Sequence, residues 1–518
     1  MRRMFGWLAI SFLLLLAIVG GGLLLTNRLA PPATGEPGEA LPLQAAQTAI
    51  DRDLAPLLAA HPGKTGAIFL GDGLDAFAAR AISARKAGRS LDLQYYIWHN
   101  DLAGRLLARE AHDAAERGVR VRILLDDMNA AGLDPHLLAM DAHPDIELRL
   151  YNPFLNRQSA GRAFELLRRL FSMNHRMHNK AWIADGRAAI IGGRNIGEQY
   201  FSADPEANFR DLDLLLFGPA AAQASALFDA YWNSAAAVPI ATLGASDPEA
   251  LRTLLAGVYR DASGEGARRY LDRVADSELM RDYDHHALRP HWSEGIEVVA
   301  DPPVKWAGDN RSGWLVERLT RMISSASREA LVVSPYFVPG EDGVARLAAL
   351  TGRGTRVGIV TNSLAANDVY AVHSGYAAYR ERLLRQGVEL YELRTNPGPR
   401  TAPVFFGKRA SLHTKAFVLD GVRGFVGSFN VDPRSKNLNT EMGVLFEDPA
   451  MARRLRDEYL RLTDPALSYR LLLNEEGELR WLDSTQASPV LLESEPDASR
   501  WRRALARMSG WLPIESQL

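Results

Sequence analysis

The chain has 518 residues, a formal net charge of −2 and no cysteine. Its length allows about two to four domains and a large hydrophobic core. The lack of cysteine excludes disulfides, thiolate metal sites, a cysteine nucleophile and a lipid-modified N-terminal cysteine. Non-specific nucleic-acid binders are usually basic, so the near-neutral charge argues against that class, although a local basic patch remains compatible with it.

The first predicted element is a membrane-spanning helix, in an anchor that we place at residues 1–28. Residues 5–26 are almost wholly apolar, and no charged residue lies between Arg3 and Arg28. This length suits a ~30 Å hydrocarbon core, and no convincing signal-peptide cleavage site follows, so a cleaved signal peptide is the weaker alternative. Arg2 and Arg3 precede the span, and the positive-inside rule then predicts a cytoplasmic N-terminus and a single-pass protein. The body would lie beyond the membrane, which in a bacterium means the inner membrane and the periplasm.

An internal repeat organises the body of the chain. Each copy reads as strand, helix, strand, strand and, after a motif described below, an acidic strand. The segments of the first copy are 91–98, 102–118, 119–127, 146–152 and 210–218. Those of the second are 330–338, 343–354, 355–363, 388–394 and 439–448. Alternating strands and helices predict an α/β fold, and we expect the two homologous halves to pack as a pseudo-twofold pair with the active site between them.

The repeat also predicts the domain boundaries. We expect a linker at 29–60, an N-terminal domain at 61–245, a polar and irregular connector at 246–300, a C-terminal domain at 301–470 and a tail at 471–518. In the tail, Trp501, Leu505, Met508 and Leu512 fall at helical spacing among several arginines. This pattern fits a basic amphipathic helix on an anionic membrane surface, and a helix docked on the protein core is the alternative.

Two copies of one motif carry the chemistry. The first is His178-x-Lys180-x4-Asp185, followed by Gly193 and Asn195, and the second repeats its spacing. The second copy consists of His413, Lys415, Asp420, Ser428 and Asn430. Two copies with the same downstream spacing are not expected by chance, and they indicate a phosphodiesterase site made from two duplicated halves.

The residue types suit phosphoryl transfer. Residues two apart on a strand share a face, so each His and its Lys should project together. A neutral imidazole can attack phosphorus, and a second imidazole can act as general acid and then as general base. The two lysines, with Asn195, Asn430 and Ser428, would bind the phosphate oxygens. This chemistry requires no metal and no cofactor.

The remaining carboxylates have predicted supporting roles. Asp185 and Asp420 belong to the catalytic motif, but they sit beside glycine turns and we interpret them as braces for those turns. Another carboxylate should orient each histidine by accepting its second ring N–H. Asp211 is the candidate for His178, with Asp213 as its competitor, and Glu441 is the candidate for His413. His373 could reach the substrate, but packing is the favoured interpretation.

The paired motifs resemble those of the phospholipase D superfamily over roughly residues 65–465. HNKAWIADGRAAIIGGRNIGEQYF (178–201), LHTKAFVLDG (412–421), the single N-terminal span and the terminal PIESQL together resemble bacterial cardiolipin synthases, most closely the C-type. This resemblance implies a phosphatidyl transfer to the free glycerol hydroxyl of phosphatidylglycerol, from phosphatidylglycerol or phosphatidylethanolamine. It also implies that His178 is the nucleophile, which forms a phosphohistidine, and that His413 is the acid and base.

Three other functions remain open from the sequence. A hydrolytic phospholipase D would use the same intermediate with water as acceptor. A nuclease of the same superfamily is disfavoured by the predicted anchor and the near-neutral charge. A catalytically dead membrane scaffold is disfavoured because both motifs are intact. We therefore expect phospholipids and a membrane as partners, and no nucleic acid.

Overall fold

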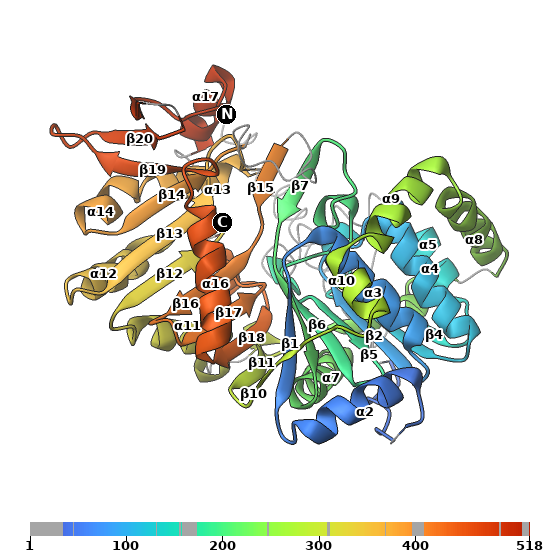
Figure 1. The fold of residues 1–518 in the computed structure, drawn as a ribbon. Coiled ribbons are helices and arrows are strands. Elements are labelled where there is room, and N and C mark those ends of the chain that lie inside the picture. The colour runs from blue at the N-terminus through green and yellow to red at the C-terminus, as the bar shows by residue number, and fades with distance from the viewer. Residues whose placement is uncertain are drawn as a thin grey trace, which may run out of the picture.

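The computed structural model describes residues 35–44, 46–130, 132–154, 157, 174–245, 248–307, 311–367, 369–395, 409–485, 488–509 and 517. Figure 1 shows two α/β halves side by side, the first coloured blue to green and the second yellow to red. The span predicted at residues 5–26 lies outside the described residues. In the described part of the chain, no helix combines the length and the apolar character that a bilayer crossing requires.

Each half is built on one mixed sheet, and the two sheets share a strand order. Within the described residues, the N-terminal sheet has nine strands, in the spatial order β10 (His291–Ser293), β1 (Thr65–Leu70), β8 (Asp213–Phe217), β6 (Ala188–Gly192), β5 (Ala181–Ala184), β2 (Ser90–Tyr95), β3 (Arg120–Asp126), β4 (Ile146–Tyr151) and β9 (Ala237–Pro239). The C-terminal sheet has ten, in the order β11 (Ile296–Ala300), β18 (Met442–Glu447), β17 (Arg423–Gly427), β16 (Lys415–Leu419), β12 (Glu329–Val333), β13 (Arg356–Asn362), β14 (Glu389–Leu393), β19 (Ser468–Leu473), β20 (Leu479–Asp483) and β21 (Val490–Leu492). The order β1-β8-β6-β5-β2-β3-β4 matches β11-β18-β17-β16-β12-β13-β14, which confirms the duplicated α/β fold.

Helices cover both faces of each sheet. The outer helices of the N-terminal half are α2 (Ala49–Ala60), α3 (Gly73–Lys86), α4 (Leu102–Glu116) and α5 (Asp134–Asp141). Those of the C-terminal half are α11 (Leu315–Ser324), α12 (Gly340–Thr351), α13 (Tyr370–Ala377) and α14 (Arg380–Arg385). Side-chain oxygens of Asp72 and Asp101 cap the N-termini of α3 and α4, which is why these helices begin where they do.

The two halves share one hydrophobic core. Helices α7 (Pro219–Trp232) and α16 (Pro449–Leu462) cover the inner faces of the two sheets. Buried side chains of both helices, among them Trp232 and Tyr459, belong to a single apolar cluster with strands of both sheets. A parallel strand pair, β7 (Ala207–Arg210) with β15 (Arg409–Leu412), crosses between the halves. Hydrogen bonds therefore join the halves in addition to apolar packing.

Part of the expected linker is folded. Helix α2 occupies its second half, and Thr48 and Asp51 form a capping box at its start. The Asp51 carboxylate is buried and accepts hydrogen bonds from the guanidinium groups of Arg89 at 2.5 Å and Arg187 at 2.7 Å. The linker expected at 29–60 therefore ends earlier than predicted, because a buried ion pair fixes the helix at residues 49–60 to the N-terminal half.

The connector is also more regular than its sequence suggested. It contains α8 (Pro248–Ala262), α9 (Glu265–Ala275) and α10 (Glu278–Asp284), followed by β10 and β11. Tyr270 and Val274 of α9 are buried against the outer core of the N-terminal half. The expectation of an irregular segment is wrong here because the polar residues lie on the solvent side of amphipathic helices. Strand β10 completes one sheet and β11 the other, so the chain changes halves between them.

The tail extends the second half. Strands β19, β20 and β21 continue the C-terminal sheet, and α17 (Arg500–Ser509) packs against α13. The Arg502 guanidinium donates to the carbonyl oxygen of Ala365 at 2.5 Å, and Ala506 is buried. Trp501 and Met508 remain 69% and 58% exposed. Helix α17 is thus docked on the protein on one side and keeps an apolar pair open to solvent on the other.

Candidate active site

The two motif histidines lie where the halves meet. His178 lies just before β5, and His413 lies between β15 and β16. The His178 backbone N–H donates to the carbonyl oxygen of Thr440 at 2.9 Å, and that of His413 donates to Arg210 at 2.7 Å. Each histidine is therefore held by the acidic segment of the opposite half.

The histidine side chains are also hydrogen-bonded to the opposite half. The Nδ1–H of His178 donates to Oε2 of Glu441 at 2.9 Å, and that of His413 donates to Oδ2 of Asp211 at 2.5 Å. Expecting Asp211 to orient His178 and Glu441 to orient His413 was wrong. The reason is tertiary: β7 pairs with β15 and Met177 bridges to Thr440, so each carboxylate enters the other half's motif.

The competing carboxylate has a different role. Asp213 is buried, accepts a hydrogen bond from the Arg80 guanidinium at 2.9 Å and accepts the backbone N–H of Arg194 at 3.2 Å. A carboxylate used in this way is part of a buried ion pair and does not orient either histidine.

Burial and charge set the protonation of His178. Burial is the main cause that lowers the pKa of His178 to about 4; Glu441 opposes this shift, and the nearby Lys180 and Lys415 ammonium groups add to it. At neutral pH the ring is therefore uncharged. Because its Nδ1–H is committed to Glu441, the lone pair lies on Nε2, where a nucleophile needs it. The effect of Lys415 on His178 also indicates that the two motifs lie close together.

The two lysines share a pattern. Lys180 Nζ donates to the backbone carbonyl of His178 at 2.5 Å, and Lys415 Nζ does the same to His413. Burial lowers the pKa of Lys180 well below its ordinary value, and the carboxylates of Glu441 and Asp211 oppose this shift. A bound phosphodiester anion would favour the ammonium form and so would raise the pKa of Lys180 again.

Aromatic rings that the sequence analysis missed restrain the histidines. The Tyr96 ring lies edge-on to His178, with the ring centroids 5.0 Å apart. Tyr200 and Phe209 lie 5.1 Å and 5.2 Å from His413. Tyr96 directly follows β2 in the run LDLQYYIW, so its position at a strand end was the available signal. These aromatic rings limit the rotation of the two imidazoles and exclude water from one side of each imidazole.

Ser428, for which we predicted a phosphate contact, instead contacts a carboxylate. Its hydroxyl donates to Oε2 of Glu441 and accepts the Met442 backbone N–H at 3.0 Å, and the residue is fully buried. The first half has Gly193 at the equivalent place. A Cβ there would lie 2.1 Å from Oδ1 of Asp211, so only glycine leaves room for the shorter carboxylate.

The two motif asparagines differ. Asn195 accepts the Ile97 backbone N–H at 3.2 Å, and its Nδ2 donates to the Tyr200 hydroxyl at 2.9 Å. These contacts favour a positioning role, through the ring that packs on His413, in place of the expected phosphate contact. Asn430 Oδ1 is buried and, among the described residues, has no hydrogen-bond partner. A phosphate contact for Asn430 stays a prediction.

Several known proteins are similar to this chain. A family model described as "Cardiolipin synthase, PLD-like domain" matches residues 82–232 and 319–463. The chain belongs to this family. Cardiolipin synthase C of Escherichia coli K12 is 40% identical over 89% of this chain and 98% of its own length. An uncharacterised protein of Helicobacter pylori J99 is 33% identical over 88% and 89%.

A solved structure supports the fold of this cardiolipin synthase family member. Phosphatidylserine synthase of Haemophilus influenzae Rd KW20 aligns with a TM-score of 0.56 over 90% of this chain and all of that one, at 13% identity. At this identity the likeness concerns the fold alone.

The motif aspartates do not touch the site in this cardiolipin synthase family member. Oδ1 of Asp185 accepts the backbone N–H groups of Arg89 at 2.7 Å and Ser90 at 3.0 Å. Asp420 makes the equivalent contacts with Arg328 at 2.7 Å and Glu329 at 3.1 Å. These contacts do not support a catalytic role for either aspartate, and they agree with the interpretation of both as turn braces.

Alanine at Asp185 should destabilise the fold more than alanine at Asp420. Both residues have φ of 55°, so the backbone strain of the substitution is common to both. Asp185 is fully buried and its loss leaves buried N–H groups unpaired, which costs roughly 2–4 kcal/mol, whereas Asp420 bonds to exposed groups and should cost about 1 kcal/mol. Urea denaturation followed by circular dichroism measures the difference. Equal losses would contradict the argument from burial, and no loss in either variant would contradict the bracing role.

Two further histidines have structural partners. His373 is buried and its Nε2 lies 3.2 Å from the Glu495 carboxylate and 2.8 Å from the Arg380 guanidinium. His175 stacks on Trp306 with centroids 4.9 Å apart. These contacts agree with packing roles for both.

Proposed function

We propose that this chain is a phosphatidyltransferase that makes cardiolipin from phosphatidylglycerol and a second phospholipid, which is phosphatidylglycerol or phosphatidylethanolamine. The observation that carries this proposal is the reciprocal pairing of His178 with Glu441 and of His413 with Asp211 across the two halves. Together with the family membership, it supports a two-step phosphoryl transfer through a phosphohistidine.

In the first step, Nε2 of His178 attacks the phosphorus of the donor lipid. The bond from phosphorus to the headgroup oxygen breaks, and His413, as imidazolium, gives the leaving alkoxide a proton. Lys180, Lys415 and Asn430 offset the charge on the non-bridging oxygens. Asp211 stabilises the imidazolium that must be present at His413 before this step.

In the second step, the acceptor alcohol replaces the headgroup. His413, now neutral, removes the proton from the free glycerol hydroxyl of phosphatidylglycerol. That oxygen attacks phosphorus, the phosphorus–nitrogen bond to His178 breaks, and cardiolipin leaves. Water in place of the alcohol would give phosphatidic acid, which is the hydrolytic alternative.

Lipid products distinguish these functions. We expect purified enzyme supplied with phosphatidylglycerol, with and without phosphatidylethanolamine, to yield cardiolipin when products are separated by mass spectrometry. Ethanolamine release would identify phosphatidylethanolamine as donor, and glycerol release phosphatidylglycerol. Phosphatidic acid without cardiolipin would replace the proposal with a hydrolase, and no lipid turnover would favour the nuclease.

The acid limb of the pH profile should report the buried nucleophile. Protonation removes the lone pair of His178, and its pKa is lowered to about 4 from the ordinary 6.5. We therefore expect kcat/KM to hold as pH falls through 6.5 and to fall tenfold per pH unit only below about 4. Circular dichroism at each pH controls for unfolding. An acid limb near the ordinary histidine value would contradict a desolvated nucleophile.

We also propose how the protein is anchored in the membrane and contacts its surface. The apolar segment 5–26 would anchor it once in the bacterial inner membrane, with the N-terminus in the cytoplasm and the domains 61–245 and 301–470 in the periplasm. The exposed Trp501 and Met508 of α17, beside its arginines, would contact an anionic lipid surface. Protease digestion of spheroplasts should remove the catalytic body, and protection of that body would overturn the orientation.

A further inference from the structure

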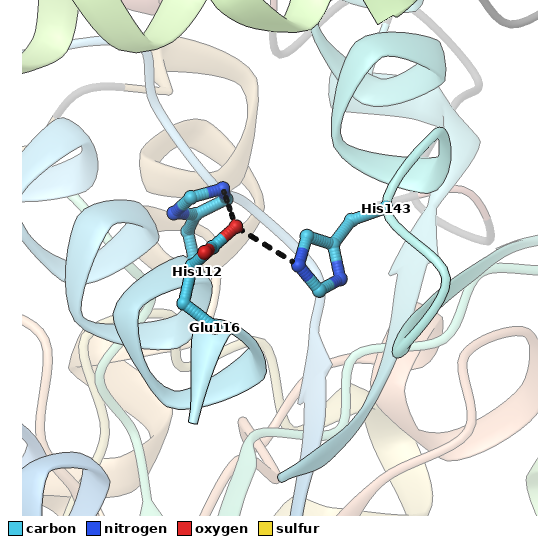
Figure 2. A group of neighbouring side chains, drawn as sticks. All are labelled: His112, Glu116 and His143. Atoms are coloured by element: carbon cyan, nitrogen blue, oxygen red, sulfur yellow. Dashed lines mark hydrogen bonds and ion pairs between the residues drawn. The ribbon is translucent and has the colours of Figure 1, made fainter. Parts of the chain in front are cut away.

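Two histidines and one glutamate meet at the surface of the N-terminal half (Figure 2). His112 and Glu116 lie one turn apart on α4, and His143 comes from the turn between α5 and β4. One oxygen of Glu116 lies 3.6 Å from Nε2 of His112 and 3.2 Å from Nε2 of His143. All three potential ligand atoms lie within 4.8 Å of one another.

This spacing fits a transition metal. Ligands at the usual zinc bond lengths are about 3.3 Å apart in a tetrahedral site, which is close to the two measured separations. Imidazole and carboxylate are the nitrogen and oxygen ligands that zinc accepts. The His112 ring is buried, and a neutral imidazole is the form that binds metal.

The surroundings also favour a cation. Glu116 is the last residue of α4, so the negative end of the helix dipole lies beside the cluster. The Glu116 side chain is 61% exposed while those of His112 and His143 are 5% and 10% exposed. An ion bound here would have protein on the histidine side and water on the other.

We propose that His112, Glu116 and His143 form a binding site for one zinc ion, completed by water. The site would fasten the C-terminal end of α4 to the turn that leads into β4. It lies at the end of the sheet where β3 and β4 begin. The catalytic His178 lies near the opposite end, because Asp126, at the end of β3, accepts the backbone N–H of the neighbouring Met177. The ion would therefore be structural, and the phosphoryl transfer would not pass through it.

Binding requires one proton to move. The backbone N–H of Asp145 donates to Nδ1 of His143 at 3.1 Å, so the ring proton of the metal-free form lies on Nε2 and points to Glu116. Zinc takes the Nε2 lone pair, and the ring proton then belongs on Nδ1. The Asp145 amide must release His143 and turn to solvent, which it can do because the bond is exposed.

Zinc binding to the full-length protein tests this site. The protein would be purified without a histidine tag, stripped with chelator, and titrated with Zn²⁺ against a chromophoric indicator. We expect one ion per chain at micromolar affinity or tighter, a rise in Tm with Zn²⁺, and a Co²⁺ absorption band typical of low coordination number.

Variants separate this site from adventitious binding. Glu116→Gln is a conservative change at an exposed side chain, so it tests the ligand without threatening the fold, and His143→Ala removes a second ligand. Each should weaken zinc binding at least about tenfold and abolish the rise in Tm. His285→Ala, which removes an exposed histidine after α10, should change neither.

Two results would overturn the proposal. If wild type binds no ion at tens of micromolar Zn²⁺, the cluster is a hydrogen-bonded clasp only. If Glu116→Gln and His143→Ala bind as wild type does, the ion lies elsewhere. Lipid turnover should be equal in stripped and zinc-loaded enzyme, and a loss of turnover on stripping would contradict the structural role.

Discussion

Replacement of His178 by alanine is expected to lower turnover at least about 10⁴-fold without unfolding the protein. The variant has no imidazole to attack phosphorus, so the phosphohistidine cannot form. A phosphatidyl ester of p-nitrophenol isolates this step, because its leaving group needs no proton. We expect wild type to release p-nitrophenolate in a burst and His178→Ala to release none. Turnover like that of wild type in the variant would refute the nucleophile assignment.

The matched variant of the second histidine separates the two roles. His413→Ala removes the general acid and base but leaves the nucleophile and its carboxylate in place. With p-nitrophenolate as the leaving group, it should keep the burst and lose the steady state, because the acceptor alcohol is no longer activated. A burst in His178→Ala and none in His413→Ala would exchange the two assignments.

Glu441→Gln is expected to lower turnover by up to about 10⁴-fold, the loss seen when a triad carboxylate is made neutral. Glu441 accepts the Nδ1–H of His178 at 2.9 Å and so keeps the lone pair on Nε2. An amide at this place can present its NH₂ group instead, which favours the wrong tautomer. The burst from the p-nitrophenyl ester should fall with the steady-state rate, because the nucleophile itself is affected.

Asp211→Asn is the matched variant, because Asp211 is the carboxylate paired with the other histidine. It touches His413, so it should behave like His413→Ala: the burst remains and the steady state falls. If each carboxylate oriented the histidine of its own half, as expected from the sequence, the two variants would show the opposite behaviour. A burst retained in Glu441→Gln and lost in Asp211→Asn would therefore show that the pairing across the halves is wrong.

Much of the fold could be predicted from the repeat. The expected strands at 119–127 and 355–363 correspond to β3 and β13, and the expected helix at 102–118 corresponds to α4. Such segments are predictable because periodicity and turn glycines act over a few residues. The prediction of an irregular connector failed because its helices cannot be recognised locally. Helix α9 exposes a mostly polar face, and only its packing on the N-terminal half shows which side is buried.

The roles of the site residues were harder to predict from the sequence than the list of residues that make up the site. Ser428 was expected at the phosphate, but it donates to Glu441, and Gly193 is required by the position of Asp211. Tyr96 and Tyr200 gave no motif signal, yet their rings hold the catalytic imidazoles. A side-chain hydroxyl or ring acquires its role from its neighbours in space, and residues distant in sequence supply those neighbours.

The sequence by itself determined that two equivalent halves exist, that each contributes one histidine and one lysine, and that the halves are α/β. Only the tertiary structure decided which carboxylate serves which histidine. The physical reason is that β7 of one half forms its hydrogen bonds with β15 of the other, as Arg176 and His178 do with Thr440. Local sequence patterns record which residues form strands, but not which strand edge each one meets.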